Sequence, residues 1–118
     1  MDFTQKSCQL KEKITSISKK MESSGMNHGT SGNISVRIPD GMLITPSSIS
    51  YIEMIADDIV SIDLNGKQLD HISSSNLHQP SSEWKLHADI LKERPEINAI
   101  IHCHSTNATA VACHGEGI

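Results

Sequence analysis

The sequence contains no long apolar run, little positive charge and no low-complexity tract, and each of these shortages excludes a class of protein. No apolar stretch approaches the ~20 residues that a helix needs to cross a bilayer. Ten basic residues against fourteen acidic ones give a formal net charge of -4, which argues against nucleic acid or an anionic membrane surface as the main partner. The 118 residues are therefore expected to form one globular domain without a nucleic acid or membrane partner.

The chain also has few cysteines and no CxxC pair. Its three cysteines are an odd number, and Cys103 and Cys113 are interpreted as small buried apolar residues. The first residues, MDFTQKSCQLKEK, lack the apolar core of a signal peptide. These features predict a reduced, cytoplasmic protein.

Two stretches carry apolar residues at the spacing of a helix with one buried face. The first covers residues 4–24 and is followed by Gly25, a natural helix end. The second begins after an N-cap at Ser81 or Ser82 and is closed by Pro95. Its buried face is predicted to consist of Trp84, Ala88 and Leu91. A small-residue helix over 106–114 is expected as the last element.

The remaining elements are predicted as strands. Alternating apolar residues at 34–38 and a continuous apolar run at 42–44, joined by a Pro-Asp-Gly turn, indicate one hairpin. Residues 58–64 and 67–72, joined by an Asn-Gly pair, indicate a second. A loop is expected over 73–79 and a last strand over 96–104. The order helix, four strands, helix, strand, helix predicts a mixed α/β fold.

Two histidines stand one residue apart near the end of the last predicted strand. Residues two apart in a strand point to the same side, so His102 and His104 could bind one metal ion while Cys103 points away. A chain with seven histidines contains such a pair by chance often enough that the pair alone also fits two ordinary, hydrogen-bonded histidines.

Glu83 adds a carboxylate to this region, because its helix leads directly into the histidine strand. A carboxylate there could be a third metal ligand or a general base. An acidic residue in the first turn of a helix also stabilises the helix dipole without any further role. The other histidines (His28, His71, His78, His87 and His114) lack partner spacing and are assigned no function.

Three short turns are rich in glycine, serine or threonine: TSGNIS, TPSSIS and PSSE. Such turns present backbone N–H groups and hydroxyls, which suit a phosphate dianion in an acidic protein. Each turn alone is equally typical of a simple cap or turn.

Taken in order, GTSGNISVRIPDGMLITPSSI, DIVSIDLNGK, PSSEWKLHADILKERPEINAIIHCHS and TAVAC resemble the class II aldolase/adducin family, with the L-fuculose-phosphate aldolases as the nearest branch. The resemblance implies a three-layer α/β/α fold with a mostly antiparallel central sheet, of which residues 1–118 would form the N-terminal half or so. It also implies one Zn2+ per subunit and a homotetramer.

The same resemblance assigns roles to individual residues. Glu83, His102 and His104 match zinc ligands of the family, and Glu83 also matches the group that moves the proton. The implied phosphate contacts are Gly32, Asn33, Ser47, Ser48, Ser81 and Ser82. The implied reaction is cleavage of a sugar 1-phosphate, such as L-fuculose 1-phosphate, into dihydroxyacetone phosphate and an aldehyde, such as L-lactaldehyde, through an ene-diolate.

The chain departs from the family pattern in two respects. The second phosphate turn usually reads Thr-Gly, where this chain has Ser47-Ser48. The third histidine ligand and a tyrosine proton donor lie in a part of the family sequence that this chain does not contain, which leads us to expect a truncated domain. The alternatives within the resemblance are a rhamnulose-phosphate aldolase, a ribulose-phosphate 4-epimerase, a methylthioribulose-phosphate dehydratase and a non-catalytic adducin-like interaction domain.

Overall fold

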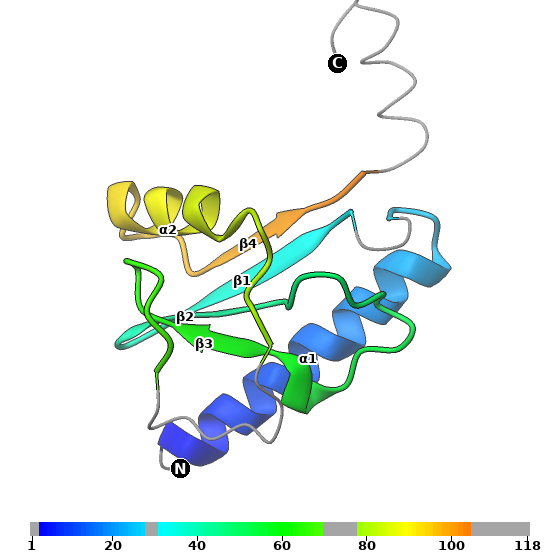
Figure 1. Cartoon of the computed structure of the whole chain (residues 1–118), viewed down its shortest axis with the longest axis horizontal. Coiled ribbons are helices and arrows are strands. Elements are labelled where there is room, and N and C mark those ends of the chain that lie inside the picture. The colour runs from blue at the N-terminus through cyan, green and yellow to red at the C-terminus, as the bar shows by residue number, and fades with distance from the viewer. Residues whose placement is uncertain (1–2, 28–30, 70–77, 105–118) are drawn as a thin grey trace, which may run out of the picture.

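A four-stranded antiparallel sheet in the order β3-β2-β1-β4 forms the centre of the protein (Figure 1). The computed structural model describes residues 3–27, 31–69 and 78–104. Its elements are α1 (Phe3–Ser23), β1 (Asn33–Ile38), β2 (Gly41–Ile44), the 3-10 helix η1 (Ala56–Asp58), β3 (Val60–Ile62), α2 (Trp84–Glu93) and β4 (Ala99–His102). Neither described α-helix is long and apolar enough to cross a membrane.

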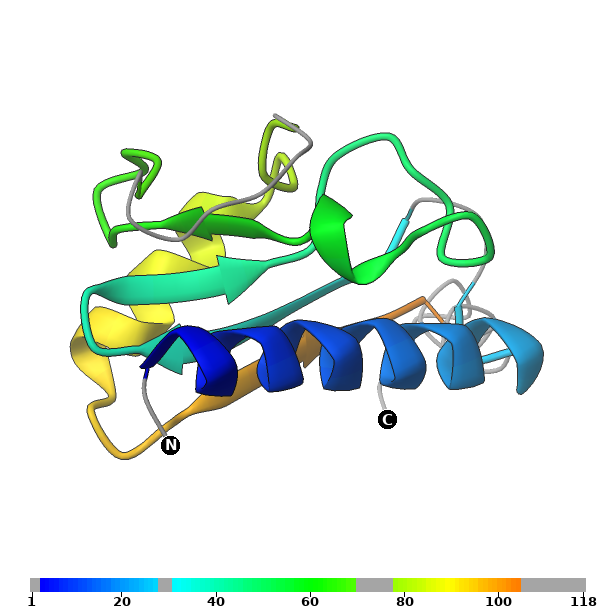
Figure 2. The same ribbon diagram turned by 90° about the horizontal axis from the view of Figure 1, so that it is seen from below.

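The two helices cover opposite faces of the sheet, with α1 in front and α2 behind in the view of Figure 2. Strand β2 contributes to both sides because successive side chains alternate: Leu43 packs in the core with α1, whereas Met42 and Ile44 pack in the core with α2. All three side chains are fully buried. This arrangement confirms the predicted mixed, three-layer α/β/α fold.

Strand β1 is polar on one face, and that face is covered by α2. Ile34 and Ile38 pack on the α1 side, so Asn33, Ser35 and Arg37 point to the other side. The Arg37 guanidinium there donates to the backbone carbonyl oxygens of Leu91 at 2.7 Å, Ile97 at 3.0 Å and Arg94 at 3.2 Å. The bond to Leu91 satisfies a carbonyl group in the last turn of α2, where helical partners run out, and the other two tie the following loop to β1.

Both predicted turns are present, but the second hairpin is shorter than predicted. The carboxylate of Asp63 accepts hydrogen bonds from the backbone N–H groups of Asn65 and Lys67 and so shapes that turn. After it, Gln68 forms only an isolated bridge to Ile62, so the described part of the predicted strand over 67–72 is not a strand. Residues 70–77 and the predicted helix over 106–114 lie outside the described residues.

Helix α2 begins later than predicted. The predicted N-cap at Ser81 or Ser82 is wrong, because Glu83 is the N-cap and the helix starts at Trp84. The reason is a short pairing with the segment after β2: the Ser81 N–H donates to the Thr45 carbonyl at 2.9 Å. This pairing holds Ser81 in place outside the helix and brings residues 79–82 beside the end of β2.

Candidate functional site

Glu83 lies where the end of this pairing meets the start of α2. Its backbone N–H donates to the Ser81 hydroxyl at 3.3 Å, and its own side chain forms no cap hydrogen bond to the helix. The carboxylate is therefore free of the helix that it begins. It reaches instead toward β1 and β4.

Two side chains from neighbouring strands hold the Glu83 carboxylate. Asn33 Nδ2 donates to Glu83 Oε2 at 2.7 Å, and His102 Nδ1 lies 2.5 Å from the same oxygen. Asn33 and His102 are paired residues of β1 and β4, which explains why both reach one atom. The Asn33 amide, followed by His102, holds the pKa of Glu83 below its usual range, so the group is a carboxylate at neutral pH.

His104 follows β4 and lies beside His102, with ring centroids 4.8 Å apart. Its backbone N–H donates to Asn27 Oδ1 at 3.3 Å. Cys103 packs against the core on the α1 side, on the other side from His102, as the strand alternation predicts. The structure thus brings together the two histidines that the sequence singled out and the Glu83 carboxylate.

These three side chains are suitable donors for a divalent metal ion, because a carboxylate and two imidazoles are ordinary zinc ligands. A metal ion bound by Glu83 and His102 together would take the place of the present contact between His102 Nδ1 and Glu83 Oε2. Within residues 3–27, 31–69 and 78–104, no group of three or more His, Cys, Asp or Glu side chains is arranged so that it could hold a metal ion.

The predicted phosphate turns lie at the same end of the sheet. Gly32 directly precedes β1, and an added Cβ there would lie 2.5 Å from Asn27 Oδ1, so only glycine fits. The Ser47 N–H donates to the Gln79 carbonyl at 3.0 Å, which brings the second turn beside the third. Ser81 is buried, whereas Ser82 is exposed.

Ser48 occupies the position where the family pattern has glycine. It is exposed and has a φ of 63°, in the left-handed region that glycine adopts without strain. Ser48 therefore keeps the left-handed backbone conformation that a glycine at this position would adopt without strain.

His87 was assigned no function from the sequence, and this interpretation is incomplete. Its side chain is fully buried on α2. Nδ1 lies 2.6 Å from Ser35 Oγ, and Nε2 lies 2.5 Å from Asn33 Oδ1. The sequence signal was weak: one polar residue on the apolar face of α2, opposite the polar face of β1.

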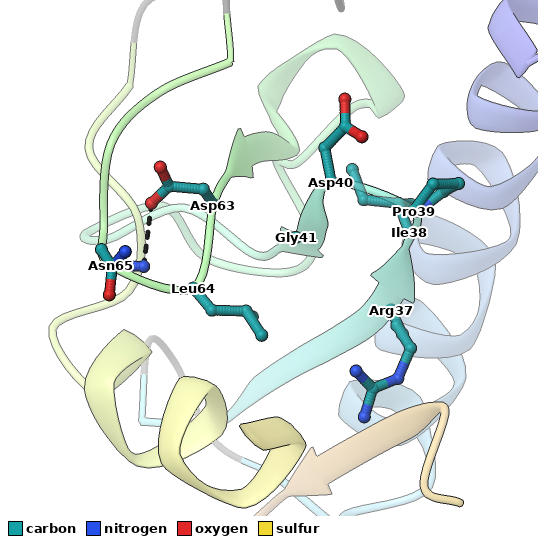
Figure 3. Close-up of a pocket in the computed structure, with 8 residues that line it drawn as sticks. All are labelled: Arg37, Ile38, Pro39, Asp40, Gly41, Asp63, Leu64 and Asn65. Atoms are coloured by element: carbon teal, nitrogen blue, oxygen red, sulfur yellow. Dashed lines mark hydrogen bonds between the residues drawn. The ribbon is translucent and has the colours of Figure 1, made fainter. Parts of the chain in front are cut away.

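A separate pocket of about 580 Å³ lies at the other end of the sheet (Figure 3). Figure 3 shows the β1–β2 turn, with Asp40, on one side and the turn after β3, with Asp63, on the other. None of the residues that line it belongs to the candidate site. The site at Glu83 is therefore defined by side-chain contacts rather than by this pocket.

The fold places the protein in a class, the three-layer α/β proteins with an antiparallel sheet. Its structure matches a solved L-fuculose 1-phosphate aldolase with a TM-score of 0.79 and 37% sequence identity, over 90% of this chain and 49% of that one. Residues 12–118 match the family described as the class II aldolase and adducin N-terminal domain. The chain belongs to this family.

Two curated relatives show to which kinds of aldolase the sequence is similar. The chain is 50% identical over 109 residues to a 5-methylthioribulose-1-phosphate/5-deoxyribulose-1-phosphate aldolase of Escherichia coli O45:K1, covering 92% of this chain and 48% of the relative. It is 47% identical over 88 residues to the L-fuculose phosphate aldolase of Escherichia coli K12, covering 75% and 38%. The chain therefore spans about half the length or less of these relatives, and its similarity extends to two kinds of sugar-phosphate aldolase.

Proposed function

We propose that this chain forms the phosphate-binding and metal-binding side of a lyase that cleaves a ketose 1-phosphate into dihydroxyacetone phosphate and an aldehyde. The observation that carries the proposal is the position of the Glu83 carboxylate, held by Asn33 from β1 and His102 from β4. A proton-transfer group thus lies beside a candidate metal ligand and three candidate phosphate turns. An adducin-like interaction domain would not need this set of groups.

Each group then has a separate task. Zinc, held by Glu83, His102 and His104, would supply positive charge that stabilises the charge developing on the substrate carbonyl oxygen. The six candidate phosphate contacts would hold the phosphate through serine hydroxyls, the Asn33 side-chain amide and backbone N–H groups other than those of Ser47 and Ser81, which donate to Gln79 and Thr45. As the bond between C3 and C4 of the ketose breaks, the C4 hydroxyl loses its proton and becomes the aldehyde carbonyl, and the electron pair of the bond remains on C3. The Glu83 carboxylate takes up a proton and delivers it to C3, which completes dihydroxyacetone phosphate.

L-Fuculose 1-phosphate, 5-methylthioribulose 1-phosphate and 5-deoxyribulose 1-phosphate are the candidate substrates, the last two because a relative is named for them. All three contain the same dihydroxyacetone phosphate half and differ in the aldehyde half. The residues assigned here contact the shared half, so they support the reaction class rather than one aldehyde. A homotetramer and a cytoplasmic location also belong to this proposal, and the native mass of the complete protein tests the former.

The test is to incubate the complete, zinc-loaded protein with each candidate and with ribulose 5-phosphate, and to measure dihydroxyacetone phosphate. Release from at least one ketose 1-phosphate is expected, with loss of activity after a chelator and recovery with zinc. No release from any of them would overturn the lyase assignment. Epimerisation of ribulose 5-phosphate alone would favour the epimerase alternative.

Glu83→Gln tests the role of the carboxylate. The amide keeps the size of the side chain but cannot move the proton, so we expect cleavage to fall by a factor on the order of 10² to 10⁴. The Kd for inorganic phosphate, measured by calorimetry, should stay within about twofold, because phosphate contacts other groups. Glu93→Gln, at the exposed far end of α2, is the matched control and should behave as wild type.

A further inference from the structure

We propose that His87 is a positioning residue: it fixes the side-chain amide of Asn33 so that Nδ2 faces Glu83, and it thereby holds the carboxylate beside His102. The inference rests on the proposed function for its catalytic consequence. The hydrogen bonds of the His87 side chain go to Asn33 and Ser35 and to none of the candidate metal ligands. The His87 backbone N–H donates to the Glu83 carbonyl at 3.4 Å, but a side-chain substitution leaves that bond in place. The effect of the side chain on the reaction must therefore pass through the Asn33 amide.

The directions of the hydrogen bonds follow from the groups involved. The Glu83 carboxylate can only accept, so Asn33 must present Nδ2 to it and Oδ1 to His87. His87 Nε2 must then carry the hydrogen that Asn33 Oδ1 accepts. Burial lowers the pKa of His87 to about 4, so the ring is neutral at pH 7, and its Nδ1 accepts a hydrogen bond from the Ser35 hydroxyl.

The opposite orientation of the Asn33 amide is unfavourable at the Glu83 end, because it would place Oδ1 against the carboxylate oxygen, acceptor against acceptor. At the other end it would require His87 to change tautomer so that Nε2 accepts from Nδ2. Glu83 thus selects the amide orientation, and the fully buried His87, with both nitrogens bonded, stabilises that selection by donating to Oδ1. The Ser35 hydroxyl can donate to Nδ1 and therefore fits this tautomer.

This selection matters for proton transfer because Glu83 forms no cap hydrogen bond to its own helix. Asn33 and His102 are the two side chains that donate to Oε2. If the amide turned, the carboxylate would lose one donor and gain a repulsive contact. A displaced carboxylate lowers the rate of the chemical step more than it lowers phosphate binding.

Three substitutions separate positioning from mere burial. The amide of His87→Gln reaches the place of Nε2 and can still donate to Asn33, so kcat should stay within about threefold of wild type. The shorter side chain of His87→Asn reaches only the Ser35 end, and His87→Leu reaches neither. Both should lower kcat by on the order of 10- to 100-fold, a larger factor than the rise in KM that follows from the role of Asn33 in phosphate binding.

The control is Leu91→Val, one turn further along the buried face of α2. This substitution perturbs packing but leaves the hydrogen bonds from Ser35 through His87 and Asn33 to Glu83 unchanged. Its kcat should therefore equal that of wild type even if its stability falls. Equal kcat values for His87→Gln and His87→Asn would overturn the inference. So would a loss of activity in Leu91→Val as large as in His87→Leu.

A measurement on the unsubstituted protein keeps the inference testable if the variants fold poorly. Two-bond 15N–1H correlation spectra of 15N-histidine-labelled protein report the tautomer of each ring. We expect His87 as the neutral Nε2–H form at pH 7; the Nδ1–H form or a charged ring would overturn the proposal. This readout does not need activity, so a protein without lyase activity would refute the proposed function while the spectrum still decides the role of His87.

Discussion

Asn33 is the residue that connects the Glu83 carboxylate to the buried His87 side chain. Its side chain joins the buried His87 on α2 to the Glu83 carboxylate at the start of that helix. With one Nδ2 hydrogen on Glu83 and Oδ1 on His87, it keeps one further N–H for a substrate. A single amide can therefore orient the carboxylate and contribute to phosphate binding.

Ser48 gives a test at the same scale. Its left-handed φ of 63° costs a side-chain-bearing residue about 1 kcal/mol or more. Ser48→Gly removes this strain and should raise the free energy of unfolding by up to about 1 kcal/mol, reduced by the greater freedom of glycine in the unfolded chain. Ser48→Val should lower it by about 1–2 kcal/mol, because a β-branched residue fits this region poorly.

Urea denaturation of the three proteins measures these differences. Ser48 and its neighbour Ser47 are both candidate phosphate contacts, so the Kd for inorganic phosphate should be determined alongside. Equal stability of the glycine and valine variants would contradict the assigned backbone conformation.

At the scale of single elements, α2 is anchored at both ends by β1. Asn33 and Ser35 bind side chains at its beginning and middle, and Arg37 binds carbonyl oxygens at and beyond its end. The three residues alternate along one face of the strand. The sequence pattern predicted this strand. The alternation of apolar and polar residues indicates one buried face and one polar face, but it does not reveal that a helix covers the polar face.

The burial of His87 within α2 makes stability depend on pH. Its pKa in the folded protein is lowered to about 4 from 6.5, so between these values the unfolded chain binds a proton that the folded one does not. Stability from this group is fully present above pH 6.5 and is lost as the pH falls toward 4. The loss amounts to at most about 3 kcal/mol.

The prediction is checked by urea denaturation of metal-free protein at pH values from 7 to 4. His87→Gln cannot titrate in this range, so the wild type should lose more stability than this variant as the pH falls. Carboxylates titrate equally in both proteins and cancel in the difference. Parallel pH profiles would show that His87 is protonated in the folded protein as readily as in the unfolded chain.

At the scale of the whole molecule, two apolar cores lie on opposite faces of one sheet. Ile14 belongs to the core with α1, and Ile62 to the core with α2. The functional groups gather at the end of the sheet where β1 begins and β2 and β4 end, whereas the large pocket lies at the opposite end. The cores can therefore be varied without changing the contacts of Glu83.

Ile14→Val and Ile62→Val test the separation of the cores. Each removes one buried methylene and should cost about 0.5–1.5 kcal/mol of unfolding free energy. Because the two residues share no core partner, the costs should add to within about 0.5 kcal/mol in the double variant. Thermal or urea unfolding measures all four proteins, and strong coupling would show that the sheet transmits packing changes between its faces.

The sequence by itself determined the elements with strong periodicity and the local turns: α1, the β1–β2 hairpin, the face of α2 with Ala88 and Leu91, and the family. It also placed His102 and His104 on one side, because alternation is a property of the strand alone. It misplaced the start of α2, because the pairing of Ser81 with Thr45 joins segments far apart in the chain. Only the tertiary structure decided that His87 is buried against Asn33 and that Glu83 faces His102, since these contacts join a helix to two strands that no local pattern relates.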